Sequence, residues 1–551
     1  MSGDEDWHER YRAATDRVPE REGTFESASG LPYEPLYTAD DVAADPERDI
    51  GYPGEFPYTR GPYTTMYRGR PWTRRNIICF RTVEATNERL RTFLDRGQTG
   101  VSYGGDNPTF RGFDTADVDR ELVGQTGAMI DSLADHRIAM DGIPIGEVSC
   151  ALGDVSPHEL VAMHVALADE RGVAREALAG TTMHSDYLNK LVGARMFTRF
   201  PQEAHRRLFR DHLEYVLEHL PKWNPVSLTG QNIQQAGATP AQEAAFTIAA
   251  GIEYLEEAVD LGFDPDDCAE RFTFFFNVSM NLFEEVAKLR AARRVWAREL
   301  TDRFDVAPEH ARLRCHCQTD GQELTSARPT NNVSRVAIQA LAAVLGGTQS
   351  LHTDAYDEPF RAPSEEAATI AMDTQHVLLE ETDAADVIDP LGGSYFVESL
   401  TDDLADRIRE YLDRIEEYGG YYEAVAEGYP QRVVREEARE YQRKVEQGEV
   451  VRVGENRYVD GDDGTAEPPQ LTVPDEEVDR QIARTERVRA ERDEAAATAA
   501  IEAIETAARG DENVFERVVE AVAAGVTVGE VTGALWEVFG DVEATASYAK
   551  H

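Results

Sequence analysis

Lysine is nearly absent from this 551-residue sequence, and positive charge as a whole is scarce. The chain carries 103 acidic residues against 56 basic ones, for a formal net charge of −47. Such a polyanion does not bind nucleic acid or an anionic membrane through its overall field. The apolar fraction of 41% argues against disorder. We therefore expect a cytoplasmic protein of a halophile, because molar salt shortens the Debye length to about 3 Å and weakens repulsion among carboxylates. The five lysines are Lys190, Lys222, Lys288, Lys444 and Lys550.

Cysteine and long apolar runs are also rare. Only two of the five cysteines lie close together, Cys315 and Cys317, and no second pair completes a zinc site. We interpret all five as reduced thiols and expect no metal site in this chain. No run of about 18 apolar residues occurs, which excludes a membrane-spanning helix. The first 20 residues carry charges of both signs without an apolar core, so they do not form a signal peptide. The other cysteines are Cys79, Cys150 and Cys268.

Short β-branched or aromatic runs alternate with helix-length segments between about residues 99 and 398. There are eight such runs, from TGVSYGGD to VIDPLGGS. The clearest helical pattern covers 281–300, with Leu282, Val286, Leu289 and Trp296 on one stripe. Eight strand–helix units predict an α/β fold of the (β/α)8 TIM-barrel type rather than an open doubly wound sheet. We expect an N-terminal extended arm over 1–98, the barrel over 99–400, and a helical tail with a linker over 401–551.

Polar residues stand at the ends of several of these runs. In a TIM barrel the carboxyl ends of the strands form the active site, so this placement fits a catalytic barrel. Ordinary loop composition explains it equally for Gly, Asp and Ser. The His316-x-Gln318 and Ser350-x-His352 spacings favour function, because residues two apart on a strand point to the same face. The other polar positions are Ser102, Asp106, Gln231 and Asn232.

Residues 61–80, GPYTTMYRGRPWTRRNIICF, concentrate four arginines and several aromatic residues in a segment without helical or strand periodicity. The stretch YTRGPYTTMYRGRPWTRR resembles the start of the catalytic subunit of the methylmalonyl-CoA mutase family. The resemblance continues in order through RFTFFFNVSMNLFEEVAKLRAARRVWA, HCQTDGQELTSARPTNNVSRVAIQALAAVLGGTQSLHTDAYDE and VIDPLGGSYFVE. It implies a (β/α)8 barrel whose axis is threaded by the pantetheine arm of coenzyme A. It also implies a radical isomerase that rearranges the carbon skeleton of an acyl-CoA with adenosylcobalamin.

The resemblance also assigns site residues. Arginine suits the phosphates of coenzyme A because its planar guanidinium donates two parallel hydrogen bonds. The implied coenzyme A contacts are Tyr63, Thr65, Met66, Arg70, Thr73, Arg75, Ser102, Arg271, Thr273 and Ser350. The implied catalytic positions around the acyl group are Ile77, Gln231, Asn232, His316 and Gln318. The positions expected to face cobalamin are Gln235, Gly321 and Glu358.

Relatives made as one chain carry a C-terminal cobalamin domain with a D-x-H-x-x-G motif, and this sequence contains no such motif. The resemblance therefore implies that adenosylcobalamin is held mainly by a separate small subunit. We expect a hetero-oligomer, with the acidic helical tail as a contact surface for that subunit.

The departures from the family fall where the acyl group is expected. Ile77 replaces a tyrosine, and Gln231–Asn232 replaces a Tyr–His pair whose histidine donates to the thioester carbonyl. Asn232 can donate too, but it cannot act as an acid. Ala194 replaces the arginine that binds the methylmalonyl carboxylate, and Arg195 is displaced by about 100° if the segment is helical. These changes predict a roomier, neutral pocket for a neutral or hydroxylated branched acyl group. The alternative is a non-catalytic paralogous subunit that serves as an assembly partner.

Overall fold

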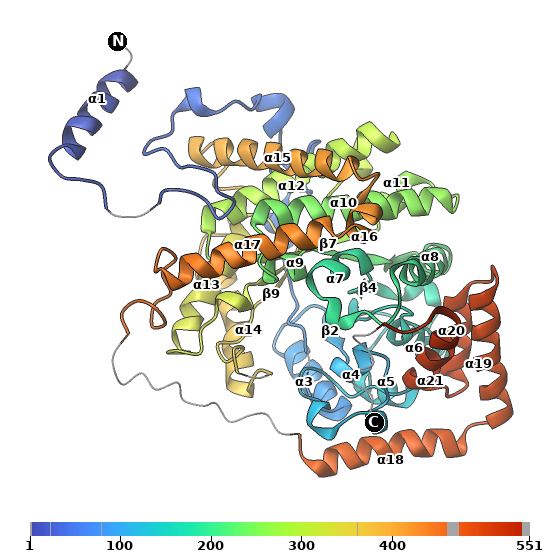
Figure 1. The fold of residues 1–551 in the computed structure, drawn as a ribbon. Coiled ribbons are helices and arrows are strands. Elements are labelled where there is room, and N and C mark those ends of the chain that lie inside the picture. Colours follow the sequence, from blue (N-terminus) through green and yellow to red (C-terminus); the bar gives the residue numbers. More distant parts are fainter. Residues whose placement is uncertain (1–2, 22–23, 79, 361, 460–472, 543–551) are drawn as a thin grey trace.

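Parallel strands form the centre of the protein, a computed structural model in which residues 3–21, 24–78, 80–360, 362–459 and 473–542 are described (Figure 1). Cys79, Lys550 and most of the linker after residue 459 lie outside these residues. The strand order is β1-β9-β8-β7-β6 in one sheet and β2-β3-β4-β5 in the other. The strands are β1 Thr73–Arg74, β2 Val101–Gly104, β3 Cys150–Gly153, β4 Ala179–Met183, β5 Lys222–Asn224, β6 Val226–Thr229, β7 Phe272–Val278, β8 Cys315–Thr319 and β9 Ser350–His352.

The two sheets join into one barrel at two places. β5 and β6 are consecutive and separated only by Pro225, which has no N–H to donate to a ladder. They act as one barrel strand that pairs first with β4 and then with β7. On the other side, Ile78 bridges to Tyr103 in parallel, and its N–H donates to the Ser102 carbonyl over 2.9 Å. The ring thus contains eight strands, and the predicted (β/α)8 barrel is confirmed.

The first strand of the barrel comes from an unexpected part of the sequence. Residues 387–394, VIDPLGGS, were expected to form the eighth strand, but they form turns. Asp389 adopts φ +47° and Gly393 φ +88°, which a strand does not allow. The ring is completed instead by β1, Thr73–Arg74, which pairs with β9. The barrel therefore begins before residue 99, inside the segment expected to be an arm.

Helices surround the ring, and α12 covers the expected helix at 281–300 (Figure 1). The helices that precede β9 are α1 Gly3–Thr15, α2 Met66–Gly69, α3 Val83–Asp95, α4 Asn107–Phe110, α5 Leu133–Ala139, α6 Glu159–Arg171, α7 Tyr187–Gly193, α8 Gln202–His219, α9 Gln231–Gln235, α10 Pro240–Asp260, α11 Pro265–Ala269, α12 Leu282–Phe304 and α13 Asn331–Leu345. Those that follow are α14 Glu365–Glu380, α15 Tyr395–Glu416, α16 Tyr421–Ala426, α17 Tyr429–Glu446, α18 Asp475–Glu491, α19 Glu494–Arg509, α20 Val514–Ala523 and α21 Val528–Phe539. None of the described helices is long and apolar enough to cross a membrane.

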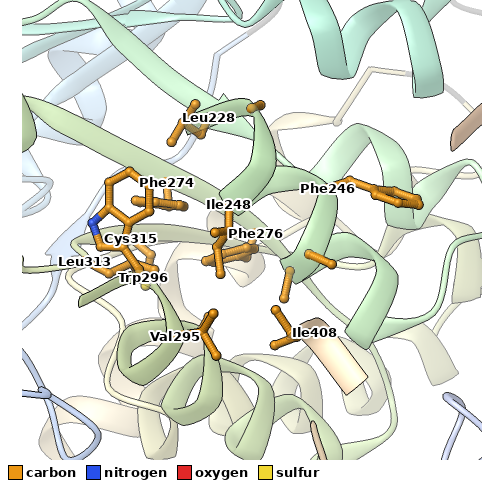
Figure 2. Close-up of a cluster of buried hydrophobic side chains, with 14 of the residues drawn as sticks. Leu228, Phe246, Ile248, Phe274, Phe276, Val295, Trp296, Leu313, Cys315 and Ile408 are labelled. Carbon is orange, nitrogen blue, oxygen red and sulfur yellow. The ribbon is translucent and has the colours of Figure 1, made fainter. Parts of the chain in front are cut away.

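The largest apolar core lies between the outer face of the strands and the helix layer of α10, α12 and α15 (Figure 2). Phe274 and Phe276 of β7 point outward and are fully buried there, with Trp296 of α12 packed against Phe274. Because side chains alternate along a strand, Phe275 points to the inside of the barrel. The same strand therefore builds the core with one face and the interior cavity with the other.

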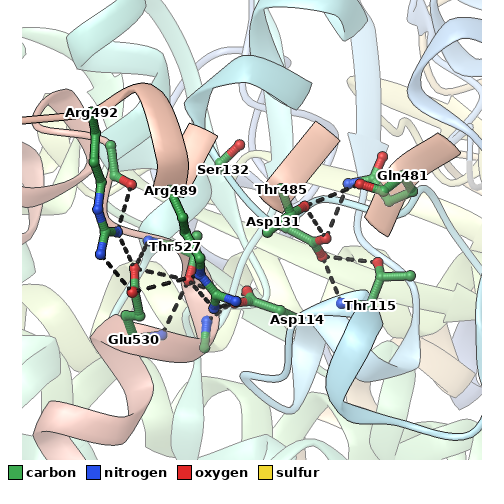
Figure 3. A network of polar contacts seen from close by, with 12 residues as sticks. Asp114, Thr115, Asp131, Ser132, Gln481, Thr485, Arg489, Arg492, Thr527 and Glu530 are labelled. Carbon is green, nitrogen blue, oxygen red and sulfur yellow. Dashed lines mark hydrogen bonds and ion pairs between the residues drawn. The ribbon is translucent and has the colours of Figure 1, made fainter. Parts of the chain in front are cut away.

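The helical tail is fixed to the barrel by buried polar contacts as well as by apolar packing (Figure 3). Asp131, in the connection between β2 and α5, accepts hydrogen bonds from the Thr115 N–H at 2.9 Å and the Thr485 hydroxyl of α18 at 2.6 Å. Asp114 accepts from Arg489 at 2.6 Å and from the Thr527 hydroxyl at 2.6 Å. Helices α18–α21 thereby brace the long connection that follows β2.

Candidate active site

A cavity of about 590 Å³ opens at the amino ends of the barrel strands. Its walls come from the segment before β1 and from the first halves of most of the strands. Nine of the ten residues predicted to contact coenzyme A line it, although they are spread over nearly 300 positions in the sequence. They are Tyr63, Thr65, Met66, Arg70, Thr73, Arg75, Ser102, Thr273 and Ser350.

Arginines set the electrostatics of this first cavity. Arg70 is exposed at its rim, and Arg314 also lines it. Arg75 lies deeper, where burial lowers the pKa of its guanidinium. One of its nitrogens donates to the Ser149 hydroxyl over 2.8 Å, while its buried Nε has no hydrogen-bond partner in the described part of the chain. The cavity thus presents an unsatisfied cationic donor to whatever enters it.

Arg271 is the predicted contact that the structure does not bring into the cavity. Its guanidinium donates to the backbone carbonyls of Val216 at 2.9 Å and Leu220 at 2.7 Å, and also to that of Trp223. These carbonyls lie at the carboxyl end of α8 and just beyond it, where Val216 also accepts the Leu220 N–H and Leu220 also accepts the Trp223 N–H. Arg271 therefore stabilises the end of a helix.

The two arginines are expected to respond differently to truncation. Arg70→Ala should weaken acyl-CoA binding by a few kcal/mol if its phosphate contact is desolvated, with little change in unfolding free energy. Arg271→Ala should lower the unfolding free energy instead, because it removes the hydrogen bonds of a charged donor to several carbonyls, each of which contributes about 1.5–3 kcal/mol. Calorimetric titration and urea denaturation separate the two effects. Equal losses of affinity in both variants would contradict this assignment.

An apolar layer crosses the barrel above the first cavity. Ala151, Met183 and Phe275 form it, and Ile77 packs against them. The ring of His316 meets Phe275 edge to face, with centroids 4.8 Å apart, and its Nδ1 lies 2.7 Å from the Ser350 hydroxyl. Burial holds the pKa of His316 well below its usual value, so the imidazole is neutral at neutral pH. Nε2 of His316 is buried without a hydrogen-bond partner among the described residues.

A second cavity, of about 960 Å³, lies at the carboxyl ends of the strands. The predicted catalytic residues Ile77, Gln231, Asn232 and Gln318 line it, whereas His316 lines the first cavity. The connection after β2, which the tail braces, contributes Glu121, Gln125 and Thr126 to the wall. The two cavities together place the predicted coenzyme A residues at one end of the barrel and nearly all the predicted catalytic residues at the other.

Hydrogen bonds fix the first turn beyond β6. The Asn232 carboxamide donates one N–H to the Gln231 side-chain oxygen over 2.6 Å. Its Oδ1 is buried and has no partner within the described residues. A primary amide carries two N–H groups, so Asn232 keeps one free donor and one free acceptor for a ligand.

On the opposite wall a histidine holds Ile77 in place. Nδ1 of His352 accepts a hydrogen bond from the Ile77 backbone N–H over 3.0 Å, and its Nε2 lies 3.0 Å from Asp354. The two contacts fix the proton on Nε2, since Nδ1 must accept. Gln318 also donates to Asp354, over 2.9 Å. One carboxylate therefore orients two residues of the cavity wall.

The residues predicted to face cobalamin lie next to each other. A Cβ atom at Gly321 would stand 3.7 Å from Glu358 Cγ and 3.9 Å from Gln235 Nε2. Glu358 lines the second cavity, whereas Gln235 lies beside it, 3.4 Å from the Asn277 side-chain oxygen. Burial, with the charges of Asp354 and Asp357, raises the pKa of Glu358 to about 8. Its carboxyl group is thus protonated at neutral pH and can donate a hydrogen bond.

Two basic residues are among those of the second cavity that the sequence analysis did not identify. Lys190 projects from α7, and His184 follows β4 with φ +73°. The pocket is therefore not lined by neutral groups alone, contrary to the expectation drawn from Ala194. The scarcity of lysine was a usable signal, because each of the few lysines in such a sequence is a candidate for a specific role. The sequence alone did not reveal that Lys190 is buried.

Comparisons with known proteins agree with this geometry. The protein-family model described as methylmalonyl-CoA mutase matches residues 26–541 of this chain. The chain is 39% identical to the 2-hydroxyisobutanoyl-CoA mutase large subunit of Aquincola tertiaricarbonis, over 96% of this chain and 94% of that protein. It is 42% identical to the methylmalonyl-CoA mutase of Cereibacter sphaeroides, over 94% of this chain and 73% of that protein. It is 39% identical to the mitochondrial methylmalonyl-CoA mutase of Homo sapiens, over 94% of this chain and 69% of that protein.

Proposed function

The chain belongs to the methylmalonyl-CoA mutase family, and we propose that it is the large subunit of a mutase for 2-hydroxyacyl or simple branched acyl thioesters of coenzyme A. The identities over nearly the whole chain make it an isomerase of the acyl-CoA mutase type. The family implies the use of adenosylcobalamin. The narrower acyl specificity is our proposal, and it depends on the second cavity.

The observation that carries the proposal is the position of Ala194. This residue is 8% exposed at the end of α7, where relatives that act on methylmalonyl-CoA hold the carboxylate-binding arginine. Neither Ala194 nor the exposed Arg195 is among the residues that line the two barrel cavities. A free carboxylate on the acyl group would thus lack its guanidinium partner. An acyl group without that carboxylate avoids the cost of an uncompensated buried charge.

Residues at the two ends of the barrel bind different parts of the substrate. The first cavity binds the coenzyme A portion through its arginines and hydroxyl groups. Asn232 donates its free N–H to the thioester oxygen, and Ile77 fills the place beside the acyl group without adding a polar contact. The apolar layer around Phe275 keeps water from the reacting carbon atoms. Reconstitution with the cofactor, followed by product analysis, tests the proposal.

The open end of the barrel fits a large polar cofactor. Glu358, protonated near neutral pH, supplies a donor, and the buried Oδ2 of Asp354 has no partner among the described residues. Gly321 leaves room beside them that a Cβ would reduce. Adenosylcobalamin, when bound, supplies the radical chemistry of the rearrangement. We assign Glu358, Gln235 and Gly321 to its protein contacts.

A separate small subunit would hold most of the cofactor. The A. tertiaricarbonis relative is described as a large subunit, and this chain spans nearly all of it. The two methylmalonyl-CoA mutases extend beyond the matched part, which covers 73% and 69% of their lengths. The description of the A. tertiaricarbonis relative as a large subunit supports a small-subunit partner and a hetero-oligomer. The helical tail, docked beside the wall of the second cavity, is the surface of this chain that we assign to that partner.

A non-catalytic paralogous subunit is the second candidate. The changes at Ile77, Ala194 and Gln231–Asn232 all lie in or beside the second cavity, which favours it. The intact first cavity and the retained His316 and Gln318 favour an active enzyme. An isotope-exchange screen of acyl-CoA thioesters in molar salt decides between them, since a non-catalytic subunit exchanges none.

We also propose that the protein works in the cytoplasm of a halophile. With a net charge of −47, the melting temperature should fall as potassium chloride is diluted from molar to tens of millimolar, because carboxylate repulsion is then unscreened. Thermal denaturation across this range measures the effect. A melting temperature that stays flat would refute the halophilic assignment.

A further inference from the structure

Lys190 is a buried basic residue of the second cavity that forms no ion pair with any described residue. Its side chain is 4% exposed, and its Nζ lies 5.2 Å from the centre of the Phe197 ring. The charge of Asp186 acts on it, but that carboxylate is occupied by the Thr229 N–H at 2.7 Å and the Tyr254 hydroxyl at 2.7 Å. Within the described residues the Lys190 Nζ makes no hydrogen bond or ion pair. Burying an ammonium group in this way is costly, and a ligand would offset the cost.

Asn232, which lines the same cavity, has a hydrogen-bond acceptor that is unpaired among the described residues. Its Oδ1 is buried and unpartnered, so it is an acceptor without a donor. The helices that carry the two residues touch, because a Cβ at Gly193 of α7 would come within 2.6 Å of the Asn232 carbonyl carbon on α9. Lys190 precedes Gly193 by three residues and therefore lies on the same face of α7. Both residues line the second cavity, Lys190 from α7 and Asn232 from the adjoining α9.

We propose that Lys190 and Asn232 bind the hydroxyl group of a 2-hydroxyacyl-CoA thioester, with Lys190 Nζ donating to it and Asn232 Oδ1 accepting from it. This inference rests on the proposed function and narrows its substrate to the hydroxylated class. A hydroxyl group is both donor and acceptor, so it can accept from Lys190 Nζ and donate to Asn232 Oδ1 at the same time. A carboxylate only accepts and would leave Asn232 Oδ1 facing negative charge. A methyl group or hydrogen satisfies neither.

The protonation of Lys190 gives the contact a pH dependence. Burial lowers its pKa to about 7, opposed by the charge of Asp186. The other titratable groups around it are His184 at the end of β4, His205 on α8, and Glu121, His352 and Glu358 in the cavity wall. An ammonium group donates a stronger hydrogen bond than a neutral amine. The preference for a hydroxylated thioester should therefore be greatest below pH 7 and should weaken as the pH rises above it.

Calorimetric titration of the chain alone, in molar salt, tests the inference without any cofactor. The two probes are 2-hydroxyisobutanoyl-CoA and isobutanoyl-CoA, which differ only by the hydroxyl group. The wild-type chain should bind the hydroxylated thioester ten- to a hundredfold more tightly. Lys190→Met should reduce this ratio to within about threefold while leaving the affinity for isobutanoyl-CoA unchanged. Lys190→Gln, which keeps an N–H donor, should recover part of the ratio.

Lys444→Met is the matched control, because it removes the same charge from α17, where the lysine pairs only with Glu26. It should leave the ratio unchanged. An unchanged ratio in Lys190→Met would overturn the inference, as would an equal loss of affinity for both thioesters. Tight binding of methylmalonyl-CoA that Lys190→Met abolishes would identify a carboxylate anchor instead. Failure of turnover with a normal binding ratio would refute the proposed function and leave this contact standing.

Discussion

Reconstituted with adenosylcobalamin and a cobalamin-binding small subunit, the chain is expected to convert 2-hydroxyisobutanoyl-CoA at least a hundredfold more efficiently than methylmalonyl-CoA. A hundredfold difference in kcat/KM corresponds to about 2.7 kcal/mol in barrier. Ala194 offers no charge to the methylmalonyl carboxylate, and Lys190 offers only one point charge beside an acceptor. Removing one partner of a buried pair costs about 3–5 kcal/mol, which is enough for this discrimination.

Product analysis by mass spectrometry measures both reactions in parallel. Ala194→Arg is the informative variant, because it returns a guanidinium to the position occupied in methylmalonyl-CoA mutases. This variant should lower the ratio of the two kcat/KM values, because it should raise kcat/KM for methylmalonyl-CoA. Rapid conversion of methylmalonyl-CoA by the wild-type protein would refute the altered specificity.

Within the same assay, Asn232→Ala should reduce kcat by about 10²–10³, the usual loss for one oriented donor at a developing negative charge. The free N–H of Asn232 is available because Gln231 takes only the other one. Binding of isobutanoyl-CoA should change little, since most contacts to the thioester lie in the first cavity. A variant that loses affinity and keeps kcat would place Asn232 in binding alone.

The strand pattern of the sequence predicted the barrel, and the family resemblance predicted most of the residues that line the first cavity. Each strand is short, apolar on its outer face and followed by polar residues, as in Phe272–Val278. The eighth strand was misassigned because such a pattern is local. The run at 387–394 has a β-branched, apolar start, yet its conformation depends on partners far away in sequence. β1, only two residues long, carries too little pattern to be recognised before its pairing with β9 is known.

Long-range contacts also decide which of these side chains line the cavities. Arg271 stands directly before β7, where a coenzyme A contact was expected, but its guanidinium reaches the end of α8. Lys190 gave no local signal of its burial, because α7 is enclosed by elements distant in the sequence, α9 and α17 among them. In both cases the deciding contact joins residues more than 35 positions apart. Composition and spacing carry no information about such contacts.

The segment at 387–394 owes its turn conformation to a buried ion-pair network, and breaking that network is expected to destabilise the protein severely. Arg290 of α12 is fully buried and donates to Asp389 at 2.5 Å and to Glu398 of α15 at 2.6 Å. Arg290→Leu leaves the Glu398 carboxylate buried with no cation, whereas Asp389 keeps Arg60 at 2.8 Å. The expected loss of unfolding free energy is about 3–5 kcal/mol, measured by urea denaturation in molar salt.

Two further variants separate the lost charge pair from the lost packing. Arg414→Leu removes an arginine whose pair with Glu417 is exposed on both sides, and it should change the unfolding free energy by less than about 0.5 kcal/mol. Arg290→Leu combined with Glu398→Leu should be more stable than Arg290→Leu alone, because no uncompensated carboxylate remains at residue 398. If the double variant is as unstable as the single one, the cost lies in packing between α12 and α15, and the ion pairs do not hold the turn at 387–394.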